Sequence, residues 1–286
     1  NPRLHYVLAM GDIDHFKRIN DILSHGVGDA VLRYVAKIIE SPTEKYFRDM
    51  DSVCRYGGEE FAMFLHDIST PDAFERLDGL RGKVNKTPLS MKLPVVSNEL
   101  SASRMIENLI TYEIKNNEWK VSDGGSITKN HVKDGLSRHG IQVDEDSMDI
   151  FDAIIEGVLC QKMIAKYNPI NNAQFELINT QIQEVFPHKK TIEIQLIITI
   201  SIGYKLINPS SYSSYVSKFE TLSKDELLEK IDKARVNITQ NIKKLSQKQL
   251  ASMLYFLDQV AACDHYLMAA KRAGRNCLIP RLSGSE

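Results

Sequence analysis

The sequence lacks the features that mark several large classes of protein. Its 286 residues carry a formal net charge of only −1, so there is no global charge signal for nucleic acid. Its four cysteines form no CxxC pair, which favours reduced thiols over disulfides or zinc ligands. The apolar runs, such as the one near residues 196–198, are far too short to cross a bilayer. We therefore expect a cytoplasmic protein and do not expect nucleic acid as its partner.

The start of the chain limits this expectation. Asn1 is not an initiator methionine, and no signal peptide is visible. A sensor or membrane anchor upstream of Asn1 stays open, and so does the input signal.

What the chain does contain is a glycine turn followed by acidic residues, at residues 55–61 with the sequence RYGGEEF. Two adjacent glycines allow a tight backbone reversal and the close approach of a ligand. Glu59 and Glu60 follow at once, so the turn is bare on one side and acidic on the other. Such a turn suits a metal-bound polyphosphate. On its own, the run is equally compatible with an ordinary β-hairpin whose acids are solvated.

A second acidic cluster lies upstream, after a short apolar run at residues 6–10 that is typical of a buried central strand. Asp12 and Asp14 stand two apart at the end of this strand and share a face in extended geometry. Mg²⁺ prefers hard oxygen ligands, commonly one or two protein carboxylates plus substrate phosphates. Asp12 and Glu59, on neighbouring strands, could supply such a pair.

Three polar residues further along offer contacts for a nucleotide. Lys17 could neutralise phosphate, and Asn20 and Asp29 offer an amide and a carboxylate to a base edge. A carboxylate can accept from donors on the guanine edge that adenine lacks, so the pair favours guanine. Taken singly, each residue is more typical of an ordinary surface position. Their order and spacing are far harder to obtain by accident.

Four separated motifs resemble the GGDEF family, the diguanylate cyclases. They lie at residues 12–29, 48–61, 199–203 and 263–276. Each is moderately specific, and all four stand in the order that the family has. The chain departs from the family in beginning almost at the first strand. It departs again in the long insertion between Arg81 and the 199–203 motif, where the family has a short hairpin.

The resemblance implies an α+β fold: a palm-like GGDEF domain with a central mixed five-stranded sheet flanked by helices, plus a mainly helical insertion. We expect the catalytic domain at residues 1–91 and 189–286, with a helical insertion at about residues 206–254. The β-branched run 192–204 is expected to return the chain to the sheet.

The first insertion, residues 92–188, is expected to be mainly helical. It is compatible with a winged-helix-like module, because two extended stretches are expected at residues 163–167 and 174–178. The candidate phosphate contacts of such a module are Lys129, Lys133, Arg138, Lys162 and Lys166. The interpretation that we favour is a helical decoration that mediates dimerisation or binds another, unknown protein.

The activity that the resemblance implies is condensation of two GTP molecules into cyclic di-GMP and two pyrophosphates, within a homodimer. The 3′-hydroxyl of one GTP attacks the α-phosphorus of the other in line. Asp12, the Ile13 carbonyl and Glu59 would hold two Mg²⁺ (or Mn²⁺) ions per half-site. Glu60 would help to position or deprotonate the hydroxyl. The implied substrate-binding residues are Phe16, Lys17, Asn20, Asp29, Lys271 and Arg275, the last two expected on one helix face.

Arg48 and Asp51 stand shortly before the glycine turn and resemble the family's inhibitory product site. Arg48 presents a planar fork to guanine or phosphate, and Asp51 can accept from guanine donors. Arg81 is a candidate for a second contact. The alternative is a plain surface ion pair worth ~0–1 kcal/mol.

Other functions stay open at this point. One is a catalytically inactive GGDEF regulatory module that binds GTP or cyclic di-GMP. Another is a palm-like cyclase or polymerase that acts on a different nucleotide, such as ATP. A DNA-binding regulator built on the insertion is the least favoured.

Overall fold

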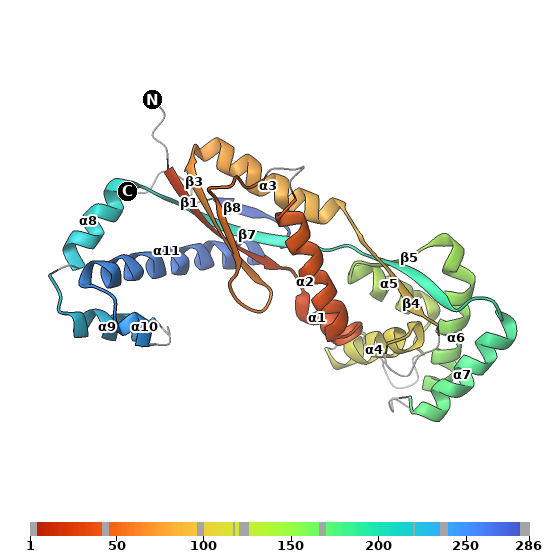
Figure 1. Ribbon diagram of the computed structural model, residues 1–286. Helices are drawn as coiled ribbons and strands as arrows, with labels where there is room; N and C mark the ends of the chain where they lie inside the picture. The colour runs from red at the N-terminus through yellow and green to blue at the C-terminus, as the bar shows by residue number, and fades with distance from the viewer. Residues whose placement is uncertain are drawn as a thin grey trace. The chain divides into compact units, whose positions relative to one another are not determined.

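A computed structural model describes residues 5–41, 46–95, 100–116, 118–119, 126–165, 170–219, 221–234 and 240–280 (Figure 1). The chain forms two compact units. Unit 1 comprises Asn1–Asp14, Ile38–Val84 and Thr199–Glu286, and unit 2 comprises His15–Lys37 and Asn85–Ile198.

Unit 1 is built on a mixed five-stranded sheet of order β2-β3-β1-β7-β8. The central strand β1 (His5–Ile13) pairs antiparallel with β3 (Glu60–Ile68) and with β7 (Ile200–Ile207). At one edge β2 (Ser52–Arg55) pairs antiparallel with β3, and at the other β8 (Leu278–Pro280) pairs parallel with β7. The expected α+β fold with a mixed five-stranded sheet is thereby confirmed.

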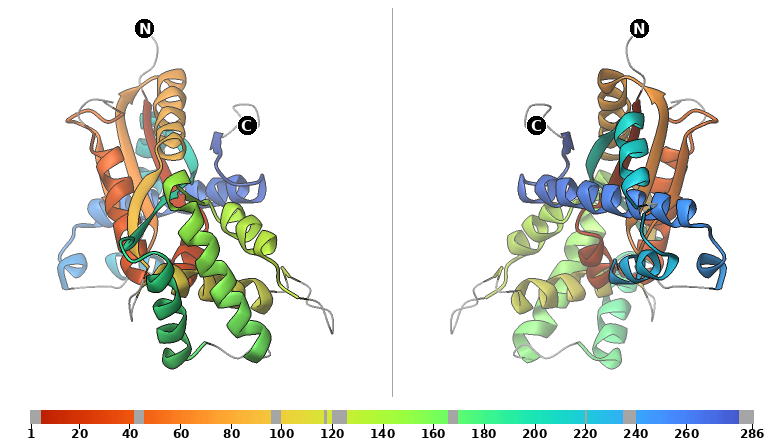
Figure 2. Two further views of the ribbon diagram at one scale, coloured as in Figure 1. Left: turned by 90° about the vertical axis from the view of Figure 1, so that its right-hand side faces the viewer. Right: turned by 90° about the vertical axis from the view of Figure 1, so that its left-hand side faces the viewer.

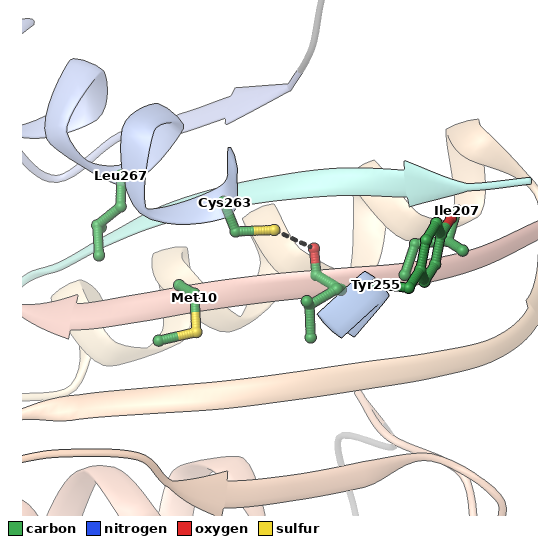
Figure 3. Packing of buried hydrophobic residues seen from close by; sticks show 6 residues of the cluster. Met10, Ile207, Tyr255, Cys263 and Leu267 are labelled. Atoms are coloured by element: carbon green, nitrogen blue, oxygen red, sulfur yellow. Dashed lines mark hydrogen bonds between the residues drawn. The ribbon is translucent and has the colours of Figure 1, made fainter. Parts of the chain in front are cut away.

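Helices cover both faces of this sheet. α11 (Gln247–Arg272) crosses one face and α3 (Thr70–Lys86) lies on the other (Figure 2). Under α11, Leu8 and Met10 of β1 pack against apolar residues of the helix, and the Cys263 thiol donates a hydrogen bond of 3.1 Å to the Leu8 carbonyl (Figure 3). Full burial of one such apolar side chain stabilises the fold by about 1.5–3 kcal/mol.

Between β7 and α11, unit 1 contains α8 (Pro209–Phe219), α9 (Lys224–Lys233) and the short α10 (Gln240–Lys243). Both α9 and α11 begin at capping boxes, because Ser223 and Ser246 each cap a helix whose third residue caps them in return. α9 packs on the N-terminal part of α11. The buried cluster between these two helices consists of Leu227, Ile231, Leu250 and Leu254.

Unit 2 contains a three-stranded antiparallel sheet of order β4-β6-β5. Its strands are β4 (Leu89–Pro94), β6 (Thr191–Leu196) and β5 (Ile141–Val143). Its helices are α1 (Phe16–Ile22), α2 (His25–Ile39), α4 (Ala102–Lys115), α5 (Lys129–Arg138), the 3-10 turn η1 (Glu145–Ser147), α6 (Met148–Ala165) and α7 (Asn172–Val185). The last residues of α2 belong to unit 1.

Two local expectations need correction. The run 192–204 does return the chain to the sheet of unit 1 through β7, but its first part, β6, belongs to the sheet of unit 2. The stretch 174–178 is not extended, since it lies in α7, which begins at a capping box of Asn171 and Gln174. Residues 163–165 of the other stretch expected to be extended lie in α6, and residues 166–167 lie outside the described residues. Neither stretch forms the expected wing where it is described.

The basic residues proposed for phosphate contact in unit 2 are already paired where they are described. Lys129 and Lys133 both form ion pairs with Asp152, and Arg138 pairs with Glu113. The Lys162 side chain and Lys166 lie outside the described residues. The charges that the structure describes are thus offset by carboxylates, which does not favour phosphate binding.

Glu113 is the centre of a buried polar network in unit 2. Its side chain is 1% exposed, and it accepts hydrogen bonds from Arg138 Nη2 at 2.8 Å and from His139 Nε2 at 2.6 Å. His139 is itself buried, and this burial is the main cause that lowers its pKa; Glu113 opposes the shift, and the charges of Arg18 and Arg138 add to it. The folded state therefore favours neutral His139.

We expect acid to destabilise unit 2 through His139. The pKa of His139 lies below its ordinary value of 6.5 in the fold, so the unfolded chain takes up the proton first as the pH falls. The stability contributed by neutral His139 is full above that value, and it is lost as the pH falls from there through the lowered folded pKa. Trp119, the single tryptophan, lies in unit 2 and reports its unfolding by fluorescence in urea.

The matched variants are His139→Gln and His188→Gln. His139→Gln should flatten the dependence of the urea midpoint on pH below neutrality. His188 is exposed, so His188→Gln should leave this dependence as it is in the parent chain. An unchanged acid slope in His139→Gln would assign the effect to another group.

Candidate active site

The turn between β2 and β3 is held tight by backbone and arginine contacts. Arg55 Nε donates to the carbonyls of Gly57 and Gly58, at 3.1 and 3.0 Å. A Cβ on Gly57 would lie 2.7 Å from Glu60 Oε2, because the Glu60 side chain folds back over this glycine. At Gly58, apart from its two chain neighbours, no described atom lies within 4 Å of such a Cβ. The turn is therefore open to a ligand at Gly58.

Strand pairing brings the end of β1 beside the two glutamates. Asp12 lies opposite Glu60 in the β1–β3 register, and the Ile13 N–H donates to the Glu59 carbonyl at 3.2 Å. Asp12 is 6% exposed, and its carboxylate forms an ion pair of 2.8 Å with Lys271. Residues 12, 59, 60 and 271 thus meet at the C-terminal end of the central strand β1.

Burial raises the pKa of Asp12 to about 6. The hydrogen bond and charge of Lys271 lower it, and the charges of Glu59 and Glu60 raise it again. Burial is the largest of these causes, and Lys271 offsets it only in part. The site therefore favours the arrival of a cation.

These donors would suit a divalent metal ion that also binds water or substrate oxygens. Within the described ranges, no group of three or more His, Cys, Asp or Glu side chains is arranged to hold a metal by itself. Asp12 and Glu59 offer two carboxylates and Ile13 a backbone carbonyl. Mg²⁺ is commonly bound by only one or two carboxylates plus phosphate oxygens, so this donor set suits it.

Lys271 and Arg275 do not share a helix face, contrary to expectation. α11 ends at Arg272, and Arg275 lies in the following turn with a left-handed φ of 66°. Its backbone N–H still donates to the Ala270 carbonyl, at 3.2 Å. Lys271 is in the last turn of the helix, where it faces Asp12. The two cations thus come from different local structures.

Four residues of the first motif, which are expected to bind the base and the phosphate tail, belong to unit 2. Phe16, Lys17 and Asn20 are on α1, and Asp29 is on α2. Asn20 Oδ1 is buried and has no hydrogen-bond partner among the described residues. Gly28 makes room for it, since a Cβ there would lie 3.0 Å from Asn20 Cγ and 3.1 Å from Phe16 Cζ. This unsatisfied oxygen is suited to a donor on a ligand.

Arg48 and Asp51 form a tied pair in unit 1. The Asp51 side chain is 0% exposed; it accepts from the Arg48 N–H at 2.8 Å and the His66 N–H at 2.9 Å, and it lies 3.6 Å from Arg76. The Arg48 side chain is 36% exposed and donates to the His66 carbonyl. Asp51 is therefore occupied within the fold, and Arg48 is the member of the pair that a ligand can reach.

The structure adds two residues to which the sequence assigned no catalytic or substrate role. Asp14 is 4% exposed and accepts hydrogen bonds from three donors. Arg81 Nη1 donates to the Asn276 carbonyl and Oδ1, both at 2.9 Å. The signal for Asp14 was its position two residues after a metal-ligand candidate; its partners are too distant in sequence to be inferred.

A family model described as "Diguanylate cyclase, GGDEF domain" matches residues 2–111. Over these residues the chain is similar to the GGDEF family. The GGDEF match includes the first acidic motif and the glycine turn. The motifs at residues 199–203 and 263–276 lie beyond it.

Curated relatives are similar over part of the chain. Diguanylate cyclase A of Treponema denticola is 44% identical over 79 residues, which are 28% of this chain and 20% of that protein. Response regulator PleD of Caulobacter vibrioides is 40% identical over 80 residues, 28% of this chain and 17% of that protein. The chain thus covers only about a fifth of the length of these curated relatives.

A solved GGDEF domain, that of PA1120 (YfiN or TpbB) from Pseudomonas aeruginosa, aligns with 99% of this chain and 85% of that one, at 16% identity and a TM-score of 0.42. Some relatives carry a different label. An uncharacterized membrane protein of Staphylococcus saprophyticus is 34% identical over 118 residues, 41% of this chain and 32% of that protein. In the described part of this chain, no helix is long and apolar enough to cross a membrane.

Proposed function

We propose that the chain is a diguanylate cyclase, which condenses two GTP molecules into cyclic di-GMP and two pyrophosphates. The observation that carries this proposal is the buried Asp12 carboxylate, paired with Lys271 at 2.8 Å beside the acidic residues of the open glycine turn. A relative named diguanylate cyclase A, 44% identical over 79 residues, supports it.

Each residue of unit 1 would have a distinct task. Asp12, the Ile13 carbonyl and Glu59 would hold Mg²⁺ or Mn²⁺, two ions per half-site, which would offset phosphate charge and lower the pKa of the attacking hydroxyl. Glu60, folded over Gly57, would position the 3′-hydroxyl or accept its proton. Lys271 compensates Asp12 in the free protein and would turn to the β- or γ-phosphate when a metal takes over that task.

The base and the rest of the phosphate tail would be held by the other proposed residues. Asn20 Oδ1, buried and unpaired among the described residues, would accept from a guanine N–H, and Asp29 would accept from the same edge. The guanine edge has donors that adenine lacks there, so these acceptors would favour GTP over ATP. Phosphate contacts would come from the backbone at Phe16 and Lys17 and from the side chain of Arg275.

One such site holds one GTP and therefore only half of the reacting atoms. We propose that two copies of the chain face each other in a homodimer during the reaction. The test is to incubate the purified chain with GTP and Mg²⁺ and to resolve the products by chromatography. The protein concentration is varied over a range that sedimentation shows to span monomer and dimer.

We expect cyclic di-GMP to form, with a specific activity that rises with protein concentration. GTP binding without product at any concentration would instead favour an inactive regulatory module. A constant specific activity across the monomer–dimer range would remove the homodimer from the mechanism. Turnover of ATP in place of GTP would contradict the substrate assignment.

We further propose that cyclic di-GMP inhibits the enzyme by binding at Arg48, with Asp51 orienting the arginine from within the fold. Arg48→Ala should raise the concentration of cyclic di-GMP needed for half inhibition by about tenfold or more, because hydrogen bonds from a charged donor are lost. The measurement is the initial rate with added product. Arg33→Ala, which removes an exposed arginine of α2, is the control and should keep the parent's inhibition curve.

Inhibition of Arg48→Ala at the parent's product concentration would remove Arg48 from the inhibitory site. Inhibition that is competitive with GTP in the parent chain would place the product in the substrate site instead.

A further inference from the structure

Asp14 has a different environment from Asp12, two residues before it. It is 4% exposed, and both of its carboxylate oxygens accept hydrogen bonds from within unit 1. Ser201 Oγ donates to Oδ1 at 2.7 Å, and Oδ2 accepts from Thr199 Oγ1 at 2.9 Å and from the Asn276 N–H at 3.0 Å. A carboxylate with three donors is satisfied by the fold. Asp14 therefore differs from Asp12, whose carboxylate forms an ion pair with Lys271.

The third of these donors belongs to an unusual turn. Gly274, Arg275 and Asn276 follow the end of α11 with φ angles of 112°, 66° and 45°. Residues with a side chain rarely adopt this left-handed region, and two of these three residues have one. Such a conformation persists only where the surrounding structure enforces it.

Two side chains enforce this turn from outside it. Asp14 binds the Asn276 N–H, and Arg81 Nη1 binds the Asn276 carbonyl and Oδ1, both at 2.9 Å. Directly after the turn, the Cys277 carbonyl accepts from the Ile202 N–H at 3.0 Å and β8 pairs with β7. Asp14 thus joins the end of β1, the start of β7 and the 274–276 turn through one carboxylate.

We infer that Asp14 is a positioning residue, which holds the 274–276 turn so that Arg275 is presented to the phosphate tail of a nucleoside triphosphate. This inference rests on the proposed function, since it takes GTP as the ligand. Asp14 touches no substrate in this role and acts through Arg275. Its charge is needed because three donors converge on it, and the amide of an asparagine would direct its own N–H groups at one or more of them.

The test is a double-mutant cycle between Asp14→Asn and Arg275→Ala. The probe is a GTP analogue with an α,β-methylene bridge, which resists the condensation, and its affinity for the full chain is measured with Mg²⁺ by equilibrium dialysis. GMP, which lacks the β- and γ-phosphates, is measured in parallel. Thermal unfolding of each variant is recorded separately.

We expect Asp14→Asn to lower the affinity for the analogue by about tenfold or more, while the affinity for GMP changes little. Arg275→Ala should have the same effect. The double variant should bind the analogue as tightly as the single variant with the lower affinity, because both changes remove the same contact. If the two losses add fully, Asp14 does not act through Arg275. Equal losses for the analogue and GMP would indicate a general structural role and overturn the inference.

Two serine variants keep the inference testable if Asp14→Asn does not fold. Ser201→Ala removes one donor to Asp14 and should weaken the analogue in the same direction, by less. Ser252→Ala removes a hydroxyl on α11 that binds the Lys248 carbonyl at 2.7 Å, and it should leave the affinity unchanged. Identical affinities in the two serine variants would count against the positioning role. A parent chain that does not bind the analogue at all would overturn the proposed function itself.

Discussion

Glu59→Gln is expected to abolish formation of cyclic di-GMP, with a loss of roughly three orders of magnitude or more. The substitution keeps the size of the side chain and removes one of the two carboxylates proposed to hold the metal. A neutral amide cannot offset a divalent charge, and metal-assisted charge stabilisation is worth several kcal/mol, about tenfold per 1.4 kcal/mol. The expected loss follows from these two magnitudes.

The change should leave the fold intact. The contact of Glu59 with β1 is made by its backbone, whose carbonyl accepts from the Ile13 N–H at 3.2 Å, and glutamine keeps that carbonyl. The measurements are product formation by chromatography and the circular dichroism spectrum of the variant. Glu75→Gln, which neutralises an exposed glutamate of α3, is the control and should turn over at the parent's rate. Near-normal product formation by Glu59→Gln would remove Glu59 from the metal site.

The parts of the site that the sequence could predict are local ones. A buried strand ending in Asp12, and a glycine turn ending in two glutamates, follow from short-range patterns. Their meeting follows from antiparallel pairing, which sets Asp12 opposite Glu60. This is why the sheet and the neighbourhood of the carboxylates agree with the sequence-based expectation.

The sequence contains local signals for the end of α11 and for the start of α7, the two places where the expected helix boundaries were wrong. Gly274 stands just after the last periodic residue of α11, and a glycine there commonly ends a helix, which places Arg275 outside it. Asn171 and Gln174 have the spacing of a capping box, which predicts the start of α7 where an extended stretch was expected.

Other features lie beyond the reach of sequence patterns. The donors to Asp14 are 185, 187 and 262 residues away along the chain, so only the folded sheet brings them together. The β-branched composition of residues 192–204 favours extended structure without saying which sheet it joins. Long-range partners of a polar group are set by topology rather than by local propensity.

Gly203→Ala is expected to cause the largest loss of stability in unit 1. Gly203 lies in β7, opposite Met10 of β1 and beside Ile279 of β8. A Cβ at this position would lie 2.6 Å from the Cys263 carbonyl oxygen and 2.8 Å from Leu267 Cα, and it would overlap the Leu267 nitrogen. All of these atoms are backbone of α11, so no side chain can rotate away.

The only relief is to move α11 off the sheet, which would loosen the apolar cluster beneath it. Overpacking of a buried site costs typically 1–3 kcal/mol, and a clash with helix backbone belongs at the upper end or beyond, so we expect a loss of about 3 kcal/mol or more. A domain of ordinary stability has only about 5–15 kcal/mol to lose. The variant should therefore unfold at a much lower urea concentration than the parent, or fail to accumulate as folded protein.

Gly82→Ala is the matched control, because it makes the same chemical change where there is space. Gly82 is in the interior of α3, and beyond its neighbours in the helix no atom of the described residues lies within 4 Å of its Cβ position. Alanine there should stabilise the helix by roughly 0.5–1 kcal/mol, since glycine is the poorer helix former. The two variants should thus shift the urea midpoint in opposite directions. A Gly203→Ala midpoint equal to the parent's would mean that α11 does not pack this closely on β7, and the placement of Lys271 beside Asp12 would lose its structural basis.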